Sequence, residues 1–298
     1  MTARPKQHEL PHDAIMVRRY SDLLRYLRKF ASGELGLVLL LGRHGTGKTE
    51  SAKNTLGIGS SGNGSAGRRA LYVEGHAQPF GMYQQLWEHR DQPIVLDDLD
   101  KLYANTDCVR LLKPLCNDGR AKEIAWITKT TINAIDLPSR FETRSNVLLI
   151  ANYWRTLNPN VRALEDRAII LHFDPDNAEV HRKVKEWFDD PVVFEFIAGY
   201  LPVVPHVSMR HYDKGRRLRR AGFEDWRQIV LQMMLPDRLA AIVAGLQVNP
   251  RFETDKERVR RFIEDTGMSR PTYYRVKRRL PSLMTSIGPA HQDPVQVG

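Results

Sequence analysis

The stretch from Gly42 to Thr49 constrains this chain of 298 residues more than any other, because it fits the phosphate-binding pattern G-x-x-x-x-G-K-[ST]. An apolar run, Leu37 to Leu41, precedes it and predicts a buried strand, and residues 50 to 53 predict the opening turns of a helix. Glycines let the backbone bend so that successive N–H groups point inward at a triphosphate, and the helix N-terminus adds its positive end. The strand, loop and helix together predict a nucleotide site in an α/β fold.

All eight residues of this loop are expected to contact the nucleotide. Lys48 would reach the outer phosphates, and Thr49 would place its hydroxyl on a magnesium ion. The expected contact residues are Gly42, Arg43, His44, Gly45, Thr46, Gly47, Lys48 and Thr49.

The segments around the loop alternate between predicted strands and predicted helices. Helices are predicted over 21–31, 81–90 and 105–117, strands over 70–73, 94–96 and 147–150, and a further strand or hairpin over 123–131. The segment 57–67 is rich in Gly and Ser and predicts a surface loop. The alternation indicates a parallel sheet covered on both faces.

Polar residues follow two of the predicted strands. Asp97 and Asp98 end the strand 94–96, which we place beside the strand that feeds the phosphate loop, where ligands gather in open α/β sheets. Asp97 is the expected magnesium partner of Thr49, and Asp98 is the candidate that polarises an attacking water. Asn152 follows the strand 147–150 and is expected to face the same crevice.

In this order, the parts resemble an AAA+ ATPase. Segments similar to the Walker A and Walker B motifs, the sensor-1 strand, the arginine-finger box and the start of the sensor-2 helix lie at 42–49, 94–98, 146–152, 163–173 and 207–210. STAND signalling NTPases also carry a double aspartate, but they usually place an arginine at the tip where this chain has Asn152. The resemblance covers about residues 37–231 and implies a P-loop three-layer parallel-sheet ATPase core with a helical lid.

The resemblance also implies ligands, partners and roles for single residues. ATP and Mg²⁺ would bind between subunits of a homo-oligomer, with Asn152 and Lys48 acting at the phosphates. Arg167 would reach the site of the next subunit as an arginine finger, with Arg162 as the alternative and Arg155 a more distant one, and Arg210 would contact the γ-phosphate of its own subunit.

One position departs from the family pattern. The second acid of the Walker B motif is usually glutamate, and this chain has Asp98, whose side chain is one methylene shorter. Because the placement of an attacking water is sensitive on the ångström scale, slow hydrolysis or an ATP-held switch is an alternative to fast turnover.

Beyond residue 250 the sequence predicts two helices joined by a tight turn. Thr254 and Glu257 have the spacing of a capping box, and Gly267 lies in the turn before a second helix over 270–280. This arrangement resembles a helix-turn-helix, and that resemblance implies base contacts from Arg270, Thr272 and Tyr273, and phosphate contacts from Arg275, Lys277, Arg278 and Arg279. The alternative is a small helical module that binds protein or completes the lid.

Positive charge is concentrated in three places. The net charge is +10, and the segment 251–280 holds ten Lys or Arg against five Asp or Glu. The other two clusters are Lys214, Arg216, Arg217, Arg219 and Arg220, and Arg18, Arg19, Arg25, Arg28 and Lys29. Basic stripes are typical of nucleic-acid binding, but a solvated face explains each cluster about as well, and it is the preferred interpretation for residues 18–29.

Composition and spacing suggest a location and a domain plan. No apolar run approaches the roughly 20 residues of a membrane span, and the polar N-terminus is unlike a secretory signal, so a cytoplasmic location without membrane contact is expected. Cys108 and Cys116 are expected to be reduced thiols. The expected parts are a basic helix and linker (1–35), the ATPase core (36–175), a helical lid (176–250), an all-α helix-turn-helix-like domain (251–288) and a disordered tail (289–298).

The favoured function is an ATPase acting on DNA or a DNA-bound complex, of the replication-initiator, helicase-loader or transposition-regulator kind. The alternatives are a protein-remodelling ATPase or nucleotide-dependent assembly switch with a protein client, and a viral-type helicase, for which no pore residues are identified in the sequence.

Overall fold

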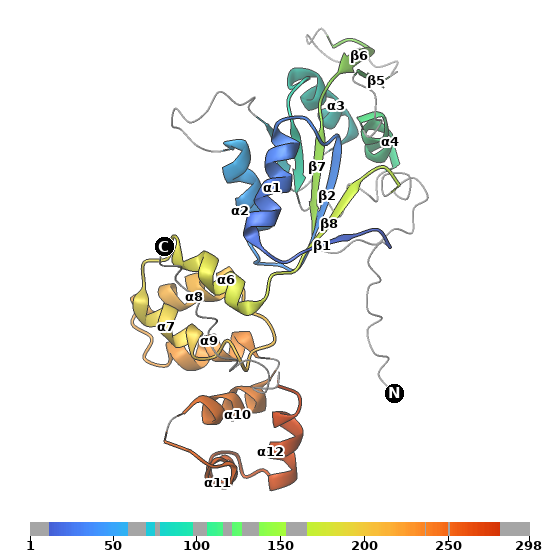
Figure 1. The fold of residues 1–298 in the computed structure, drawn as a ribbon. Helices are drawn as coiled ribbons and strands as arrows, with labels where there is room; N and C mark the ends of the chain where they lie inside the picture. The colour runs from blue at the N-terminus through green and yellow to red at the C-terminus, as the bar shows by residue number, and fades with distance from the viewer. Residues whose placement is uncertain are drawn as a thin grey trace, which may run out of the picture. The chain divides into compact units, whose positions relative to one another are not determined.

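The computed structural model describes residues 12–58, 70–74, 78–97, 106–115, 121–126, 137–152, 166–235, 237–249 and 251–280 (Figure 1). The chain divides into two compact units, Met1–Pro175 and Asp176–Gly298. Within the described residues no single helix is long and apolar enough to cross a membrane. Only the bent pair Trp226–Met234 and Arg238–Val248, taken together, reaches that length and composition, and buried residues of both helices belong to the core of the second unit.

The first unit is built on a parallel sheet. Its described strands lie in the order β1-β8-β2-β7-β4-β3 and pair in parallel throughout. The strands are β1 (Ile15–Val17), β2 (Leu37–Leu41), β3 (Leu71–Glu74), β4 (Ile94–Asp97), β7 (Val147–Ala151) and β8 (Ile169–Phe173). Every residue of β2, β4 and β7 is buried, as expected for central strands covered on both faces.

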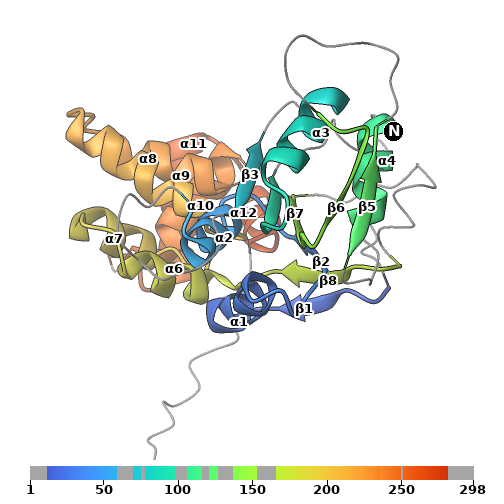
Figure 2. The same cartoon turned by 90° about the horizontal axis from the view of Figure 1, so that it is seen from above.

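Helices cover both faces of this sheet. Helices α1 (Tyr20–Ala31) and α2 (Lys48–Leu56) lie on one side, and α3 (Pro79–Glu88) and α4 (Thr106–Leu115) on the other (Figures 1 and 2). The predicted three-layer α/β P-loop core is therefore confirmed. Buried residues of α3 and α4 join the strands in one apolar core.

Residues 15–31 belong to this core, so this part of the expected separate basic helix and linker over 1–35 is wrong. Residues 1–11 lie outside the described residues. Strand β1 extends the sheet beside β8, and α1 packs on α2 through a buried stripe. The buried residues of α1 are Tyr20, Leu23, Leu27 and Phe30, which recur at helical spacing. Asn146, just before β7, donates through Nδ2 to the carbonyls of Phe30 and Leu35 and fixes the end of this helix.

The strand order also corrects one expectation. Strand β4 does not neighbour β2, because β7 lies between them and pairs with both. Crossover connections leave the order of parallel strands open, and the fully buried run Val147–Ala151 takes the central place. The predicted strand or hairpin near 123–131 is present in its described part as β5 (Lys122–Ala125), which pairs antiparallel with β6 (Arg140–Thr143). Cys116 and most of the expected loop 57–67 lie outside the described residues.

The second unit is helical. Its described helices are α6 (Asn177–Lys185), α7 (Pro191–Ala198), α8 (Met209–Arg220), α9 (Trp226–Met234), α10 (Arg238–Val248), α11 (Asp255–Thr266) and α12 (Arg270–Lys277). One apolar cluster runs through all of them. Helix α10 packs against both α11 and α12, so the expected domain boundary near residue 250 falls inside a packed group of three helices.

The predicted capping box before α11 is confirmed. The Glu257 N–H donates to Thr254 Oγ1 at 3.3 Å, and the Thr254 N–H donates to Glu257 Oε2 at 3.1 Å. The helix ends at Gly267, whose φ of 67° lies in the left-handed region and whose N–H donates to the Ile263 carbonyl at 2.8 Å. Helix α11 is therefore defined at both of its ends by local hydrogen bonds.

We predict that Thr254→Ala speeds amide hydrogen exchange in α11 about fivefold, because loss of an N-cap acceptor costs roughly 1 kcal/mol. Exchange over residues 255–266 of the full chain, followed by mass spectrometry, measures the effect. Thr254→Ser keeps the acceptor oxygen and should exchange like the wild type. Equal exchange in the Ala and Ser variants would contradict the capping role.

Candidate nucleotide site and nucleic-acid interface

The phosphate loop has a backbone that only glycine accommodates at three positions. Gly45 and Gly47 have φ of 70° and 79°, in the left-handed region. Gly42 has φ of 154°, and a Cβ there would lie 2.2 Å from the Phe173 carbonyl oxygen. The loop is therefore closed against the end of β8, and Gly47 is the N-cap of α2.

The Lys48 ammonium lies inside this loop. Its Nζ donates to the Gly42 carbonyl at 2.7 Å, to the Arg43 carbonyl at 2.9 Å and to Asn152 Oδ1 at 3.1 Å. The residue is only 5% exposed. Loop and strand tip thus hold a positive charge where the sequence pattern puts the outer phosphates, and they bring Lys48 and Asn152 into direct contact.

The hydroxyl of Thr49 donates to Asp97 Oδ2 at 2.6 Å. The same carboxylate oxygen accepts from the Tyr72 hydroxyl at 2.8 Å. Asp97 is 5% exposed and ends β4, and Tyr72 comes from the neighbouring strand β3. Two hydroxyl donors on one oxygen fix the orientation of this carboxylate.

Tyr72 is a residue that the sequence analysis missed. Burial and the hydrogen bond to Asp97 raise its pKa, so the hydroxyl stays a donor. The Lys53 ammonium lies 4.1 Å from the Tyr72 ring centroid and 3.9 Å from Glu74 Oε2. The pairing of Glu74 with Asp97 could have indicated Tyr72, because this register brings the polar end of β3 to the end of β4.

The oxygen atoms of Thr49 and Asp97 fit a magnesium ion bound together with a nucleotide. Among the described residues, no group of three or more His, Cys, Asp or Glu side chains could hold a metal by itself. Magnesium in phosphate sites usually takes one or two protein oxygens and completes its shell with phosphates and water. One hydroxyl beside one oriented carboxylate therefore suits that ion.

Arg43 differs from the expectation. Its guanidinium pairs with Asp174 through Nε at 2.8 Å and donates to the Pro175 carbonyl at 2.9 Å. Two oxygen partners beyond the end of β8 hold this side chain, so the contact of Arg43 with a nucleotide stays a prediction. Thr46 is 1% exposed, and its carbonyl accepts from the Tyr20 hydroxyl at 2.7 Å, which joins the loop to α1.

Two predicted site arginines, Arg167 and Arg210, lie outside the phosphate loop. Arg167 is exposed and precedes β8. Because Ile169 of β8 pairs with Val38 near the start of β2, Arg167 lies at the amino ends of the strands, and the phosphate loop lies at their carboxyl ends. Arg210 is exposed in the first turn of α8, in the second unit. Asp98, Arg155 and Arg162 lie outside the described residues.

The packing of helix α12 contradicts one of the expected DNA contacts, Tyr273. Tyr273 is fully buried, packs edge-on against Phe262 at 5.5 Å and accepts from Gln247 Nε2 at 2.6 Å, so it cannot meet a base edge. Lys277 pairs with Asp255 at 2.7 Å and lowers the pKa of that carboxyl. Arg270 and Arg275 are exposed, and Thr272 is half-buried.

Four arginines of the basic cluster on α8 form ion pairs within the second unit. Arg216 and Arg220 pair with Asp189, Arg217 pairs with Asp213, and Arg219 pairs with Asp190, whose side chain is 4% exposed. Three carboxylates thus compensate part of the positive charge that the sequence indicates for this helix.

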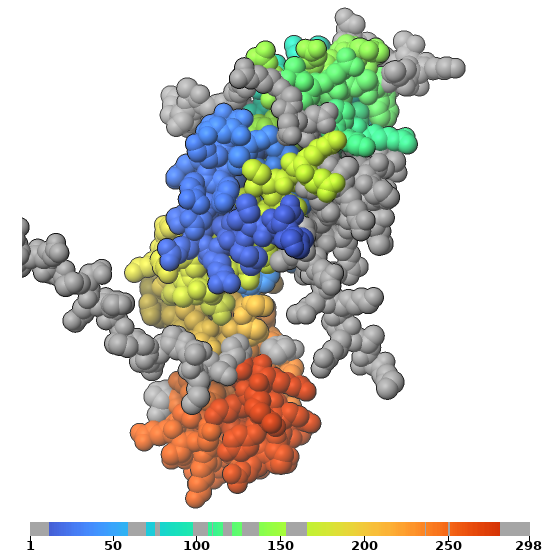
Figure 3. All heavy atoms as spheres, turned by 45° about the vertical axis from the view of Figure 1, so that its right-hand side comes forward, coloured from blue at the N-terminus to red at the C-terminus, as the bar shows by residue number. Residues whose placement is uncertain are grey.

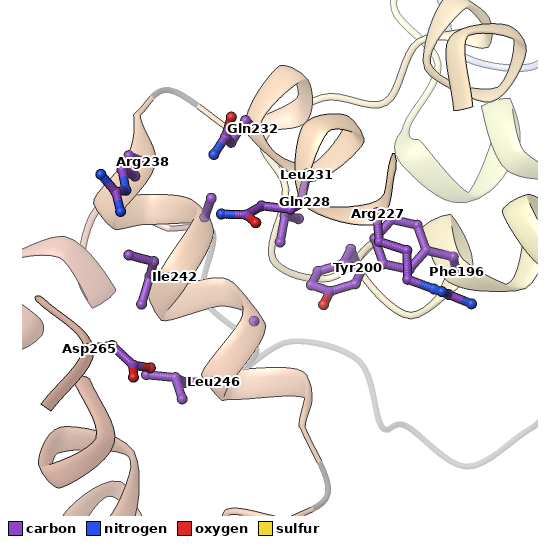
Figure 4. Close-up of a pocket in the computed structure, with 12 residues that line it drawn as sticks. Phe196, Tyr200, Arg227, Gln228, Leu231, Gln232, Arg238, Ile242, Leu246 and Asp265 are labelled. Carbon is purple, nitrogen blue, oxygen red and sulfur yellow. The ribbon is translucent and has the colours of Figure 1, made fainter. Parts of the chain in front are cut away.

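A cavity of about 350 Å³ opens between α7, α9 and α10. Figure 4 shows Leu231 from α9 and Ile242 from α10 lining it, with Tyr200 at one side. Two exposed arginines, Arg227 and Arg238, also contribute to its wall. The lining is thus mainly apolar with positive charge beside it.

Comparisons with known proteins give distant similarities. No protein-family model matches the chain. It is 24% identical over 165 residues to an uncharacterized 36.7 kDa protein from the nrdC-mobD intergenic region of Enterobacteria phage T4, a match that covers 52% of this chain and 50% of the phage protein. The chain thus spans about half the length of that relative.

Solved structures with a similar arrangement include three at low identity. NtrX from Brucella abortus in complex with ATP is 13% identical with a TM-score of 0.37, covering 90% of this chain and 69% of NtrX. The Orc1 protein of Aeropyrum pernix in complex with DNA is 17% identical with a TM-score of 0.40, covering 87% and 81%. AMPPCP-bound DnaA from Aquifex aeolicus is 13% identical with a TM-score of 0.43, covering 91% and 97%.

We predict that Tyr72→Phe raises the Mg²⁺ concentration for half-maximal nucleotide binding about fivefold to tenfold, because the Asp97 carboxylate loses a donor that orients it. Titration of Mg²⁺ against the full chain with a fluorescent ATP analogue measures the shift. Tyr83→Phe is the matched control, since its hydroxyl donates to the Pro138 carbonyl instead. A Mg²⁺ midpoint equal to that of the control would contradict the role of Tyr72.

Proposed function

We propose that this chain is an AAA+ ATPase that binds ATP with Mg²⁺ between subunits and acts on DNA or on a DNA-bound complex. One observation supports the proposed binding of ATP. Lys48, Thr49, Asp97 and Asn152, which come from separate segments, meet at the carboxyl ends of the adjacent strands β2, β7 and β4. This is the edge where open parallel sheets bind ligands.

Each of these side chains has a task that its contacts support. Lys48 neutralises the outer phosphates, and Asn152, already a partner of Lys48, orients the water beside them. Thr49 and Asp97 hold the magnesium ion, which supplies charge neutralisation at the phosphates when it is bound. Asp98, the next residue after Asp97, is the proposed base that polarises the water.

The position of Arg167 supports a shared site. It precedes the amino end of β8, whereas the phosphate loop follows the carboxyl end of β2. The five residues of β2 separate the two edges by roughly 15 Å of extended chain. An arginine at that distance from its own loop can serve as a finger only in the site of another copy.

Exposed arginines of α12 support the DNA part. Arg270 and Arg275 lie on its outer surface with Arg278 and Arg279, while the inner face, formed by Tyr273 and Val276, packs in the core. Guanidinium groups suit phosphate oxygens and guanine edges. The first residues of a second helix after a tight turn are those that a helix-turn-helix offers to DNA.

Two observations favour a second candidate, a protein-remodelling ATPase or assembly switch with a protein client. Helices α10, α11 and α12 share one apolar core with the lid helices, as a module that completes the lid would. The cavity lined by Leu231 and Ile242 could receive an apolar side chain of a client, with Arg227 and Arg238 near it. ATP turnover that rises with a protein partner and ignores DNA would favour this candidate.

We predict that Arg167→Ala lowers ATP turnover at least about 100-fold and leaves ATP affinity within about threefold, because a finger acts on the transition state. Lys48→Ala abolishes ATP binding. At an equal mixture, about a quarter of the interfaces in a cyclic oligomer join an intact Lys48 to an intact Arg167, and turnover returns there.

A phosphate-release assay on each variant and on the mixture measures this complementation. Arg110→Ala removes an exposed arginine of α4 and should keep wild-type turnover. A mixture no more active than its two components would exclude Arg167 as a finger supplied by a neighbour.

We predict that Arg270→Ala/Arg275→Ala weakens binding of a labelled duplex at least about tenfold, because two exposed phosphate or base contacts are lost. Fluorescence anisotropy at several KCl concentrations measures it. Arg217→Ala/Arg220→Ala removes the same charge from arginines already paired with carboxylates and should bind like the wild type. Equal affinities of the two double variants would remove α12 as the DNA contact.

A further inference from the structure

The outer face of α1, together with the two residues before it, carries arginine charge that no ion pair among the described residues compensates. Arg18, Arg19, Arg25 and Arg28 are exposed, and none of them forms an ion pair with another described residue. Only Lys29 in this cluster is compensated, through Glu34 at 2.7 Å. The blue segment that includes α1 lies at the molecular surface in Figure 3.

The arginines are not needed to form or pack the helix. Its inner face, with Leu23, Leu27 and Phe30 all fully buried, holds it on the core. Arg25 lies three residues before Arg28 and four before Lys29, and like charges at these spacings repel each other along a helix. Such a face gains stability when a partner brings negative charge to it.

A comparison with α8 separates a structural basic cluster from this one. In sequence both segments hold five basic residues. In the structure Arg216, Arg217, Arg219 and Arg220 each pair with Asp189, Asp190 or Asp213. Helix α1 has one acid, Asp22, which forms no ion pair among the described residues. A helix face that is merely solvated usually alternates its charges, whereas the segment 18–31 carries five basic residues and one acid.

We propose that the arginine face, formed by Arg18, Arg19, Arg25 and Arg28, is a second nucleic-acid contact that binds the phosphate backbone of DNA without reading its sequence. This inference rests on the proposed action on DNA and adds a surface on the ATPase unit to the one on α12. Guanidinium groups bind phosphate oxygens in pairs of hydrogen bonds. Binding through phosphates gives affinity and position, while base contacts give sequence preference.

The chemistry of this face favours a nucleic acid over a membrane. A helix that lies in a membrane interface buries its apolar face in lipid. The apolar face of α1 is already used, because Tyr20, Leu23, Leu27 and Phe30 pack in the protein core. The exposed residues on its outer side include Arg25, Arg28 and Lys29, which suit a phosphate backbone.

The test is the salt dependence of DNA binding by the full-length double variant Arg25→Ala/Arg28→Ala. A fluorescein-labelled duplex of random sequence and the matching single strand serve as probes over a range of KCl concentrations. We expect the slope of log K against log [KCl] to fall by about 2 in magnitude for the duplex, and affinity at low salt to fall about threefold to tenfold. Arg217→Ala/Arg220→Ala loses the same charge and should keep the wild-type slope, and fluorescent-ATP binding should be equal in all variants.

The outcomes separate this inference from the proposed function. If Arg270→Ala/Arg275→Ala loses DNA while the α1 variant binds like the Arg217→Ala/Arg220→Ala control, the arginine face is not a DNA contact and the proposed function stands. If the wild type binds neither probe at low salt, both fail. Binding to anionic phospholipid vesicles that is lost in the α1 variant, with DNA binding unchanged, would overturn the inference in favour of a lipid surface.

Discussion

The hydrogen bond between Thr49 and Asp97 depends on the whole sheet being in register. Thr49 follows the loop after β2, Asp97 ends β4, and β7 lies between the two strands. Leu41 pairs with Ala151, and Asp97 pairs with Ile150, so the three strands end within one residue of each other. Because a shift of one residue would turn the side chains of a strand to the other face, the buried apolar residues that set the register also set the site.

The position of β7 explains why Asn152 contacts Lys48. Strand β7 lies between β2, which leads into the phosphate loop, and β4, which ends in Asp97. Asn152, the residue after β7, is therefore placed between the loop and Asp97, where it contacts Lys48. The sequence alone, which suggested that β4 lies beside β2, left Asn152 without a defined neighbour. The observed order makes its contact with the loop a direct consequence of sheet topology.

Local patterns predicted the elements well, because each element depends on residues close in the chain. The phosphate loop, the central strands and the capping box of Thr254 all follow from spacing within a few residues. Tyr72 was missed because its role comes from a neighbouring strand, 25 residues before Asp97. The ion pair of Arg43 was not predicted because its partner, Asp174, lies 131 residues away.

Tyr273 shows a different kind of error, in which a motif was preferred to periodicity. Tyr273, Val276 and Leu280 recur at helical spacing and are all buried, so the pattern of an inner face was present in the sequence. A resemblance to a DNA-reading helix assigned the same tyrosine to the outside. Burial decides the matter, because a tyrosine packed against Phe262 contributes more to the core than it could to a groove.

Sequence patterns could not predict which basic residues are paired with acids, because the partners lie far apart in the chain. Ion pairs on α8 join residues up to 31 positions apart, so the count of basic residues overstated its free charge. On α1 the same count leaves four arginines without such partners among the described residues. Tertiary contacts therefore change which basic cluster is the stronger candidate for binding an acidic partner. The cluster at 18–29, interpreted from sequence as a solvated face, becomes a candidate.

The contacts of α1 suggest how DNA and nucleotide would influence each other. Tyr20 at its first turn donates to the Thr46 carbonyl of the phosphate loop, and Asn146, which leads into β7, holds the carbonyls at its end. The opposite end of β7 continues into Asn152, the partner of Lys48. A ligand that displaces α1 must move groups bonded to the loop and to β7, whereas a ligand that fits α1 in place stabilises the arrangement that holds the phosphates. By linkage, nucleotide binding would then strengthen the hold of the arginine face on DNA by the same factor.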